Sequence, residues 1–280
     1  MNQIKLMYIT NNPQTAIIAE NSGIDRIFVD LECIGKEERQ GGLDTVKSSH
    51  TIEDIKAIRD VIKKSELLVR SNIIHDATNE FCSSKEEIDK IIEAGADVIM
   101  LPYFKTVEEV KTFVDLVGGR AKTFPLVETK EAVEKIDEIL EIDGIDEIYI
   151  GLNDLSLSYG KKFLFELLAD GTVEKLIEKF REKEIPFGFG GVASMGKGML
   201  PSEYILREHY RLGSSSVILS RSFCNTDKIS DMTQLKDIFE QGIKNIREFE
   251  KECSSSSSEV FLKNKKELEN IVNSIVGSIN

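Results

Sequence analysis

Short apolar runs alternate with longer segments of helical period along most of the chain. Eight runs rich in Val, Ile and Phe predict β-strands, at Lys5–Ile9, Arg26–Glu32, Leu67–Arg70, Asp97–Leu101, Thr123–Glu128, Glu147–Leu152, Phe187–Val192 and Ser216–Ser220. The segments between and after them predict helices near residues 13–22, 52–64, 84–94, 106–117, 130–141, 172–184, 201–211 and 231–250.

This alternation determines the predicted fold class. Repeated strand–helix units indicate an α/β protein with a parallel sheet, and eight units over about 250 residues match a closed (β/α)8 TIM barrel. The alternative is an open doubly wound sheet, whose usual sign is a G-x-G-x-x-G turn after the first strand. The first turn here reads TNNPQTA instead. We therefore predict the barrel.

The segment after the eighth predicted helix differs from the rest of the chain. The serines Ser254 to Ser258 predict a low-complexity hinge. Beyond it an approximate apolar stripe predicts one more helix, formed by Val260, Leu262, Leu268, Ile271, Val272 and Ile275. We expect a catalytic barrel domain over residues 1–250, then a hinge and an additional C-terminal helix over residues 251–280. The stripe needs a surface, either on a neighbouring subunit or across the outer helices of the barrel.

Composition narrows the class of protein. The chain has 280 residues, 41% hydrophobic and 30% charged, as in a soluble globular protein. No apolar run approaches the roughly 18 to 20 residues that cross a bilayer, so we expect no membrane partner. The start, MNQIKLMYIT, has no charged region followed by a long apolar core, and nothing suggests export. We expect a cytoplasmic protein.

Charge and cysteine spacing exclude two further kinds of site. The net charge is −13, and the basic residues are spread among acids. Binding to a phosphate backbone needs a positive patch, so nucleic acid is not an expected partner. Cys33, Cys82, Cys224 and Cys253 stand far apart without a CxxC spacing. This pattern indicates reduced thiols and neither a zinc site nor a disulfide framework.

Carboxylates and arginines predominate at the predicted strand ends, where a barrel builds its active site. The residues there are Asp30 and Glu32, Arg70, Pro102, Glu128, Asn153 and Asp154, Ser194, and Arg221. Glu128 and Asp154 end adjacent strands, and two nearby carboxylates resist joint ionisation unless a cation lies between them. Mg²⁺ suits such a pair because it takes one or two protein carboxylates and leaves positions for water and substrate. The sequence therefore predicts a divalent-metal site.

Each of these residues also has a structural interpretation. Acids commonly occupy the first turn of a helix, where the helix dipole is positive, so Glu128 and Asp154 could be capping residues. For Asp154 alone the two interpretations are equally supported, whereas two acids at adjacent strand ends favour the metal. Arg70 has the alternative of a surface or salt-bridged arginine.

Several segments resemble one known family. They are IFVDLE at 27–32, LLVRSN at 67–72, AGADVIMLPYFKTVEE at 94–109, PLVETKEAVEKIDEIL at 125–140 and GIDEIYIGLNDLSLSYG at 144–160. Together they resemble the HpcH/HpaI aldolase and citrate lyase family of phosphoenolpyruvate/pyruvate-binding barrels, over about residues 4–224. The last two segments are the specific part of the resemblance.

The resemblance implies roles for three matching residues. Glu128 and Asp154 would ligate a divalent ion, Mg²⁺ or Mn²⁺, and Arg70 would bind the carboxylate and enolate of a pyruvate-like unit. This role fits the chemistry, because a chelated metal stabilises the charge that develops when a C3–C bond breaks. The guanidinium of Arg70 is a planar fork of donors suited to a carboxylate. The family resemblance also favours a homo-oligomer whose C-terminal helix reaches over a partner.

The sequence departs from the aldolase pattern at two positions. Aldolases of this family usually carry His after the Glu of the second strand, and Cys33 stands there; Leu126 stands where they commonly have Gln. The segment DLECIGKEERQGG is similar to the citrate lyase branch in supplying Lys36 and Arg39. With Glu32 and Asn153, these two residues are predicted to bind substrate.

Three histidines and one glycine-rich loop are further candidates. His50, just before the second predicted helix, is our candidate acid/base, since His titrates near neutrality; a solvent-exposed loop His is the alternative. His75 is a weaker candidate, and His209 is expected on a helix surface. Gly190 to Gly198 match a P-loop except that Gly198 replaces Ser or Thr, so we expect at most an anion-binding loop.

Two functions from different classes follow. The first is a divalent-metal-dependent carbon–carbon lyase or aldolase acting through a pyruvate-type enolate, on a 2-oxo acid or a related acyl substrate. The alternative is a barrel that binds a pyruvate-like metabolite without turnover, because Cys33 occupies the usual base position. In both, the partner is a small-molecule carboxylate.

Overall fold

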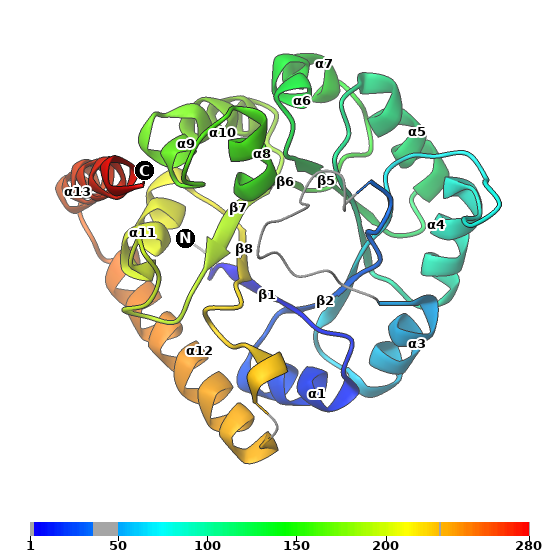
Figure 1. The fold of residues 1–280 in the computed structure, drawn as a ribbon, viewed down its shortest axis with the longest axis horizontal. Coiled ribbons are helices and arrows are strands. Elements are labelled where there is room, and N and C mark those ends of the chain that lie inside the picture. Colours follow the sequence, from blue (N-terminus) through cyan, green and yellow to red (C-terminus); the bar gives the residue numbers. More distant parts are fainter. Residues whose placement is uncertain (1–2, 36–49, 230, 280) are drawn as a thin grey trace.

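Eight parallel strands close into a barrel in the order of the chain (Figure 1). The structure is a computed structural model that describes residues 3–35, 50–229 and 231–279. The strands are β1 (Lys5–Ile9), β2 (Arg26–Asp30), β3 (Glu66–Arg70), β4 (Val98–Leu101), β5 (Lys122–Val127), β6 (Ile148–Ile150), β7 (Phe187–Val192) and β8 (Ser216–Leu219). β8 pairs with β1, which closes the barrel. The predicted (β/α)8 barrel is confirmed.

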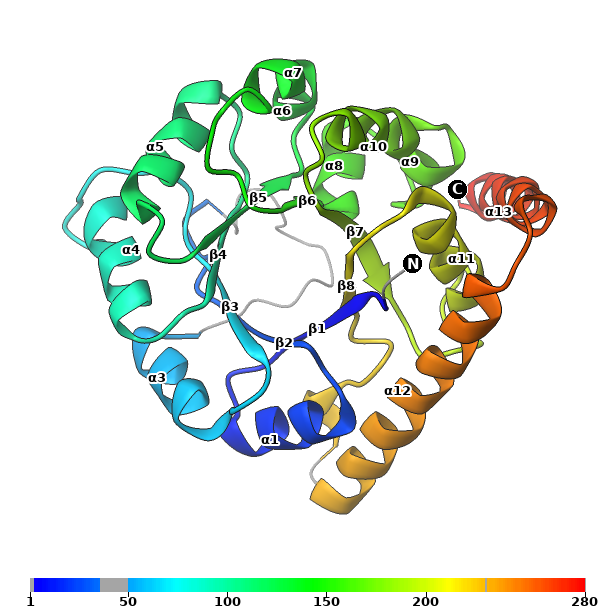
Figure 2. The ribbon, with the colours of Figure 1, turned by 180° about the vertical axis from the view of Figure 1, so that it is seen from behind.

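Helices surround the strands on all sides, as Figure 2 shows from behind. They are α1 (Pro13–Ser22), α3 (Ile52–Val61), α4 (Ser84–Glu93), α5 (Val107–Val117), α6 (Lys130–Glu134), α7 (Ile136–Ile139), α8 (Leu152–Ser158), α9 (Glu166–Ala169), α10 (Thr172–Glu182), α11 (Ser202–Leu212), η1 (Thr226–Lys228), α12 (Met232–Ser254) and α13 (Ser258–Ser278). The helix predicted over 130–141 is split into α6 and α7, and α8 and α9 were not predicted. None of the described helices is long and apolar enough to cross a membrane.

Three helices of the outer layer begin in the same way. Thr51, Ser83 and Thr106 each accept a hydrogen bond from the backbone N–H three residues later, and the acid at that later position accepts one from the backbone N–H of the cap residue. Such a capping box satisfies two helix donors that would otherwise lack partners. The capping boxes fix the residues at which α3, α4 and α5 begin, and so where the loops after β2, β3 and β4 end.

The barrel interior is packed and does not form a channel. Its buried side chains are Met7, Phe28, Leu68, Val98, Met100, Phe124, Leu126 and Tyr149. The Tyr149 hydroxyl donates to the carbonyl oxygen of Gly190 and accepts from the N–H of Ile218 at 3.0 Å. The ladder between β7 and β8 shifts register between Gly188 and Gly191. Tyr149 therefore provides hydrogen-bond partners to backbone groups of β7 and β8 near the register shift.

The last two helices extend the barrel on one side (Figure 1). α12 runs to Ser254, so the predicted serine hinge is reduced to the turn of residues 255–257. α13 packs against α11 and α9 of the same chain, with Leu268 and Val272 buried. The apolar stripe thus covers outer helices of the barrel. Val260 and Leu262, at the start of α13, remain 40% and 64% exposed.

The prediction for His209 is wrong. His209 is fully buried in α11, where its ring stacks on Phe189 with centroids 3.8 Å apart. Its Nδ1 lies 2.8 Å from the hydroxyl oxygen of Ser214, and burial lowers the pKa of the imidazole to about 3. The ring is a neutral core residue because α11 turns this face towards β7 and not towards solvent.

Candidate active site

Glu128 follows β5 directly, and Asp154 is the third residue of α8, which follows β6. Both side chains are buried, at 3% and 8% exposure. Glu128 Oε1 accepts a hydrogen bond of 2.9 Å from the N–H of Tyr103 in the loop after β4. A Cβ on Gly151 would lie 2.7 Å from Glu128 Oε2. A glycine is therefore needed where α8 begins, so that the chain can pass the Glu128 carboxylate.

Glu128 lies in a field of like charges. Burial raises the pKa of its carboxyl group well above the usual range, and the charges of Asp154 and Glu32 raise it further. The charge of Arg70 opposes them, but the net direction remains upward. Three acids from the ends of β2, β5 and β6 thus act on one another, although they lie far apart in the sequence.

This donor set fits a hard divalent cation. Among the residues that the structure describes, no group of three or more His, Cys, Asp or Glu side chains forms a metal-binding cluster. Mg²⁺ needs fewer, because it is commonly held by one or two carboxylates and completes its shell with water and substrate oxygens. Glu128 and Asp154 supply oxygen ligands of this kind, and a cation between them would relieve their repulsion.

Arg70, at the end of β3, is already held by two acids. Its Nε and Nη2 donate to Asp30 Oδ1 and Oδ2 at 2.8 and 2.7 Å, and Nη2 lies 3.3 Å from Glu32 Oε2. Burial acts to lower the pKa of Arg70, but these two carboxylates raise it above its ordinary value. Among the described residues, Nη1 has no hydrogen-bond partner, so this is the nitrogen that remains for a substrate. Sequence reasoning placed Asp30 at a strand end and assigned it no role.

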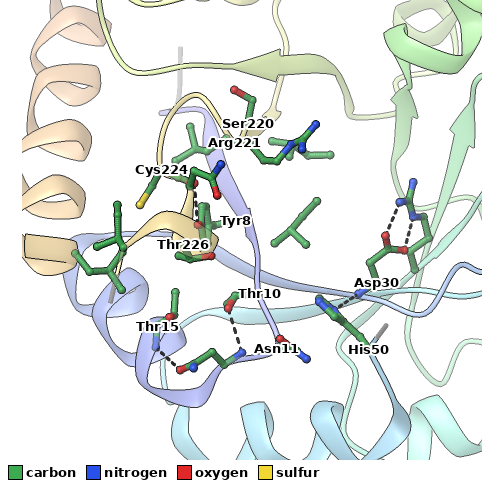
Figure 3. A pocket seen from close by; sticks show the side chains of 18 of the residues that line it. Tyr8, Thr10, Asn11, Thr15, Asp30, His50, Ser220, Arg221, Cys224 and Thr226 are labelled. Atoms are coloured by element: carbon green, nitrogen blue, oxygen red, sulfur yellow. Dashed lines mark hydrogen bonds and ion pairs between the residues drawn. The ribbon is translucent and has the colours of Figure 1, made fainter. Parts of the chain in front are cut away.

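His50 lies beside this pair. Its Nδ1 accepts a hydrogen bond of 3.0 Å from the backbone N–H of Asp30 (Figure 3). In a neutral imidazole one nitrogen accepts and the other carries the hydrogen, so Nε2 carries it here. The ring is therefore a proton donor at Nε2 in this form.

The other residues predicted to bind substrate have different positions. Asn153 is exposed, and its amide donates to Asp154 Oδ1 at 3.3 Å. Glu32 is 1% exposed and lies against Arg70. Lys36 and Arg39 lie outside the described residues. Asn153 and Glu32 thus contact the predicted metal ligand and the predicted substrate-binding arginine, respectively.

A network at the start of the loop after β2 was not found from the sequence. Asn72 Oδ1 accepts from the backbone N–H groups of Cys33 and Ile34 at 2.9 and 3.0 Å, and Asn72 donates to Glu87 Oε1. Burial, and then the charge of Glu87, raise the pKa of the Cys33 thiol. Cys33 is thus a protonated thiol at neutral pH and a poor substitute for the usual histidine base. The positions of Cys33, Asn72 and Glu87 in the sequence do not predict this network, because the residues meet only in the folded chain.

The glycine-rich loop after β7 makes hydrogen bonds through its own backbone carbonyl groups. Gly190, Gly196 and Gly198 have positive φ angles of 59°, 70° and 95°, which glycine adopts without strain. The hydroxyl of Ser202 lies within 3.0 and 3.1 Å of the carbonyl oxygens of Ala193 and Ser194. The role of this loop in binding an anion stays a prediction.

A cavity of about 550 Å³ opens beside Asp30, His50 and Arg70 (Figure 3). Its other walls come from β1, β8, the loops that follow them, and the first residues of α12. Glu128 and Asp154 are not in its lining, because β5 and β6 stand across the barrel mouth from β1 and β8. The Asp30–Arg70 pair lies between the two regions.

Comparison with known proteins identifies the family. The family model described as HpcH/HpaI aldolase/citrate lyase matches residues 3–163. The chain belongs to this family. A hydroxypyruvate/pyruvate aldolase of Roseobacter denitrificans is 26% identical over 176 residues, which cover 52% of this chain and 60% of that protein. A 2-keto-3-deoxy-L-rhamnonate aldolase of Escherichia coli K12 is 29% identical over 107 residues, covering 28% and 40% of the two chains. The chain thus spans only about half the length of these relatives.

Solved structures support the fold of this family member. The crystal structure of an HpcH/HpaI aldolase from Desulfitobacterium hafniense has a TM-score of 0.59 and 16% identity, and covers 88% of this chain and 93% of that one. That of the citrate synthase SbnG has a TM-score of 0.61 and 16% identity, with 84% and 94% covered. At this identity the likeness establishes the barrel alone.

Proposed function

We propose that this chain is a divalent-metal-dependent carbon–carbon lyase or aldolase that acts through a pyruvate-type enolate on a 2-oxo acid or a related acyl substrate. The observation that carries the proposal is the buried Glu128 beside Asp154 and Glu32, where burial and like charge raise the pKa of Glu128. Such a cluster is unfavourable without a cation. The named activities of the relatives agree with this class of reaction.

The metal would be Mg²⁺ or Mn²⁺, held by Glu128 and Asp154, and would supply a Lewis acid to the 2-oxo and carboxylate oxygens of the substrate. Arg70 Nη1 would donate to the substrate carboxylate, while Asp30 holds the rest of the guanidinium in place. Asn153 would orient Asp154 through its amide. Glu128 and Asp154 are buried, and the exclusion of water strengthens their electrostatic contacts.

His50 is proposed as the acid/base residue. The hydrogen bond from the Asp30 N–H to Nδ1 leaves the hydrogen on Nε2, so in this form His50 would donate a hydrogen bond to the substrate oxygen. To act as a base, the ring would first release this hydrogen bond and carry its hydrogen on Nδ1, which frees Nε2 to take the substrate proton; the imidazolium so formed would return it. The replacement His50→Ala should slow deuterium exchange into the methyl group of pyruvate more than decarboxylation of oxaloacetate, because only exchange begins with proton abstraction.

The test of this function does not require the natural substrate. Loss of CO₂ from oxaloacetate leaves the C3–C4 electron pair on C3 as the enolate of pyruvate, which then takes up a proton. We expect this decarboxylation to need added Mg²⁺ or Mn²⁺, to stop with EDTA and to fall to the free-metal background in Glu128→Gln. The exposed Glu138→Gln is the matched control. Wild-type protein no faster than free metal would refute the proposal.

A second candidate is the metabolite-binding barrel without turnover, and the raised pKa of the Cys33 thiol favours it. Calorimetry with Mg²⁺ and pyruvate separates the two, since binding without decarboxylation supports the second candidate.

We further propose a cytoplasmic homo-oligomer whose catalytic domain is residues 1–250, with residues 251–280 at the subunit contact. The exposed Leu262 and Val260 support this, because the rest of the α13 stripe is covered within the chain. Light scattering should show a smaller mass for Leu262→Glu than for the wild type. An unchanged mass would limit α13 to its intrachain role.

A further inference from the structure

Tyr103, in the loop after β4, has a backbone conformation that is unusual for its side chain. Its φ angle is 48°, in the left-handed region, where residues other than Gly, Asn and Asp are uncommon because Cβ approaches the following carbonyl oxygen. Among the described residues, Glu184 is the other non-glycine residue with a positive φ. Glu184 precedes β7, at the N-terminal end of the strands, whereas Tyr103 lies at the opposite end, beside Glu128.

The short connection between β4 and α5, residues 102–106, is fixed at two consecutive positions. The N–H of Tyr103 donates to Glu128 Oε1 at 2.9 Å. The next residue, Phe104, is 2% exposed, and its carbonyl oxygen accepts from Thr129 Oγ1 at 2.8 Å. A strained backbone persists only where its surroundings hold it, and such residues gather at functional sites. Here the surroundings are the candidate metal ligand and the residue after it.

The contact with Glu128 belongs to the backbone of Tyr103 and does not depend on its side chain. The ring is half-buried, and the exposed Lys105 lies over it with Nζ 5.2 Å from the ring centroid. Such a cation–π contact near the surface is weak, whereas a hydrogen bond to a buried carboxylate is charge-assisted and strong. We therefore relate the left-handed conformation to the hydrogen bond with Glu128.

The second oxygen of Glu128 lies on the other side of the carboxylate. In the part of the chain that the structure describes, Glu128 Oε2 has no hydrogen-bond or ion-pair partner. It lies next to Gly151, where an added Cβ would be 2.7 Å away. Gly151 directly precedes α8, the helix that carries Asp154. One oxygen is thus held by the loop after β4, and the other lies beside the start of α8.

We infer that Tyr103 is the residue that positions Glu128 for the cation: its left-handed backbone directs the N–H to Oε1 and leaves Oε2 for the metal. The inference rests on the proposed function. A carboxylate that is already oriented by a hydrogen bond needs no further ordering when a cation binds, and outer partners of this kind commonly determine metal affinity. Loss of the N–H contact should therefore weaken cation binding although both ligands are present.

The experiment compares side chains that differ in their tolerance of the left-handed region, by calorimetry of the full chain with Mn²⁺. Tyr103→Gly and Tyr103→Asn keep this conformation accessible and should bind Mn²⁺ within about threefold of the wild type. Tyr103→Val disfavours it through the branched Cβ and should bind about tenfold more weakly. Equal affinities for the Gly and Val variants would overturn the inference, because the side chain or neither part of Tyr103 would then matter.

Glu184→Val is the matched control, since it places the same side chain at the other residue with a positive φ. It should unfold at lower urea concentration in metal-free buffer, as Tyr103→Val does, and leave the Mn²⁺ affinity unchanged. An equal loss of affinity in the two Val variants would overturn the inference. If Tyr103→Val does not fold, Tyr103→Ala replaces it and should bind Mn²⁺ about threefold to tenfold more weakly than the Gly variant.

The assignment of Oε2 to the metal has its own test. Gly151→Ala places a methyl group 2.7 Å from Oε2 and should weaken Mn²⁺ binding about tenfold or more. Gly277→Ala, in α13, is the control, because an added Cβ there meets nothing within 4 Å, and its affinity should equal that of the wild type. Unchanged affinity in folded Gly151→Ala would overturn the assignment of Oε2.

The wild type separates a failure of this inference from a failure of the proposed function. If the wild type binds Mn²⁺ and decarboxylates oxaloacetate while the Gly and Val variants bind equally, the inference about Tyr103 fails and the proposed function stands. If the wild type neither binds Mn²⁺ nor decarboxylates oxaloacetate, the proposed function fails and this inference fails with it.

Discussion

Among the described residues, both ends of the barrel interior contain buried charge, but the charges are arranged differently. At the N-terminal end of the strands, fully buried Arg26 donates to Glu147 at 2.5 and 2.8 Å and to Glu66 at 2.7 Å. Lys5 and Lys122 complete this cluster. At the C-terminal end, Arg70 is held by Asp30 and lies beside Glu32, and its charge also acts on Glu128. Both acids of the first cluster are hydrogen-bonded to cations, whereas Glu128 in the second lies buried beside the like charges of Asp154 and Glu32.

The first cluster is therefore expected to stabilise the fold, and the second to bind a cation or substrate. Charges that are paired and hydrogen-bonded inside the fold need nothing further, and removing one partner leaves the other buried without compensation. Glu128 is buried beside like charges that raise its pKa, which is expected where a cation or substrate group completes the site. Substituting a charged residue is therefore predicted to lower the stability of the protein at the N-terminal end, and to reduce metal or substrate binding at the C-terminal end.

The largest expected effect is on metal binding at the mouth. Glu128→Gln should abolish Mn²⁺ binding measured by calorimetry, because a neutral amide is a weaker ligand than a carboxylate. In metal-free buffer the same variant should unfold at equal or higher urea concentration than the wild type, since one like charge is gone while Oε1 still accepts from Tyr103. A variant that binds Mn²⁺ as well as the wild type would remove Glu128 from the metal site.

At the other end, breaking the cluster should reduce stability. Arg26→Met removes both hydrogen bonds from Glu147, which is 6% exposed and keeps Lys5 Nζ only at 3.7 Å, at a cost of about 3–5 kcal/mol. Urea unfolding measures the loss. The partly exposed Arg59→Met, which breaks the ion pair with Asp97, is the control and should change the free energy of unfolding by about 0–1 kcal/mol. Equal losses in the two variants would contradict the comparison.

Arg70→Lys tests the arginine that Asp30 holds at the mouth. Lysine cannot hold Asp30 with two parallel hydrogen bonds and still donate to the substrate, so decarboxylation of oxaloacetate should fall about 10²-fold. The exposed Arg120→Lys serves as the control. Steady-state rates at saturating Mg²⁺ give the measurement, and a loss under threefold would mean that Arg70 only supports the fold.

The smallest effect is the pH dependence of the N-terminal cluster. Burial acts to raise the pKa of Glu66, but Lys122 and Arg26 lower it from 4.5 to about 2. A folded-state pKa below the unfolded value gives stability that is present above pH 4.5 and is lost as the pH falls towards 2. Glu66→Gln should thus lower the free energy of unfolding by about 1–2 kcal/mol at pH 6.

The difference in the free energy of unfolding between Glu66→Gln and the wild type should become smaller below pH 4.5. Urea titrations at several pH values measure this difference. For Glu267→Gln, in the half-exposed part of α13, we expect no difference in the free energy of unfolding at any pH. A gap that widens in acid would contradict the assignment of Glu66 to the cluster.

Part of the candidate site was predictable because it follows from the fold. Glu128 and Asp154 end consecutive strand predictions, and parallel strands bring such ends to one rim of a barrel. Arg70 was found by the same rule. The partners of these residues were not predictable: Asp30 holds Arg70 across the β2–β3 register, in which Asp30 lies opposite Arg70, and no local pattern specifies that pairing.

The eight strands, most of the helices and the family could be predicted from the sequence, because apolar periodicity and strand-end residues are local properties of the chain. The folded structure was needed to show which nitrogen of His50 carries hydrogen, that His209 is a core residue, and that Thr15 and Ser220 share one cavity. These depend on contacts between α1, β2, β8 and α11, whose residues lie far apart in the chain. Closing the barrel brings them together, and the local pattern of polar and apolar residues does not encode which side chains then meet.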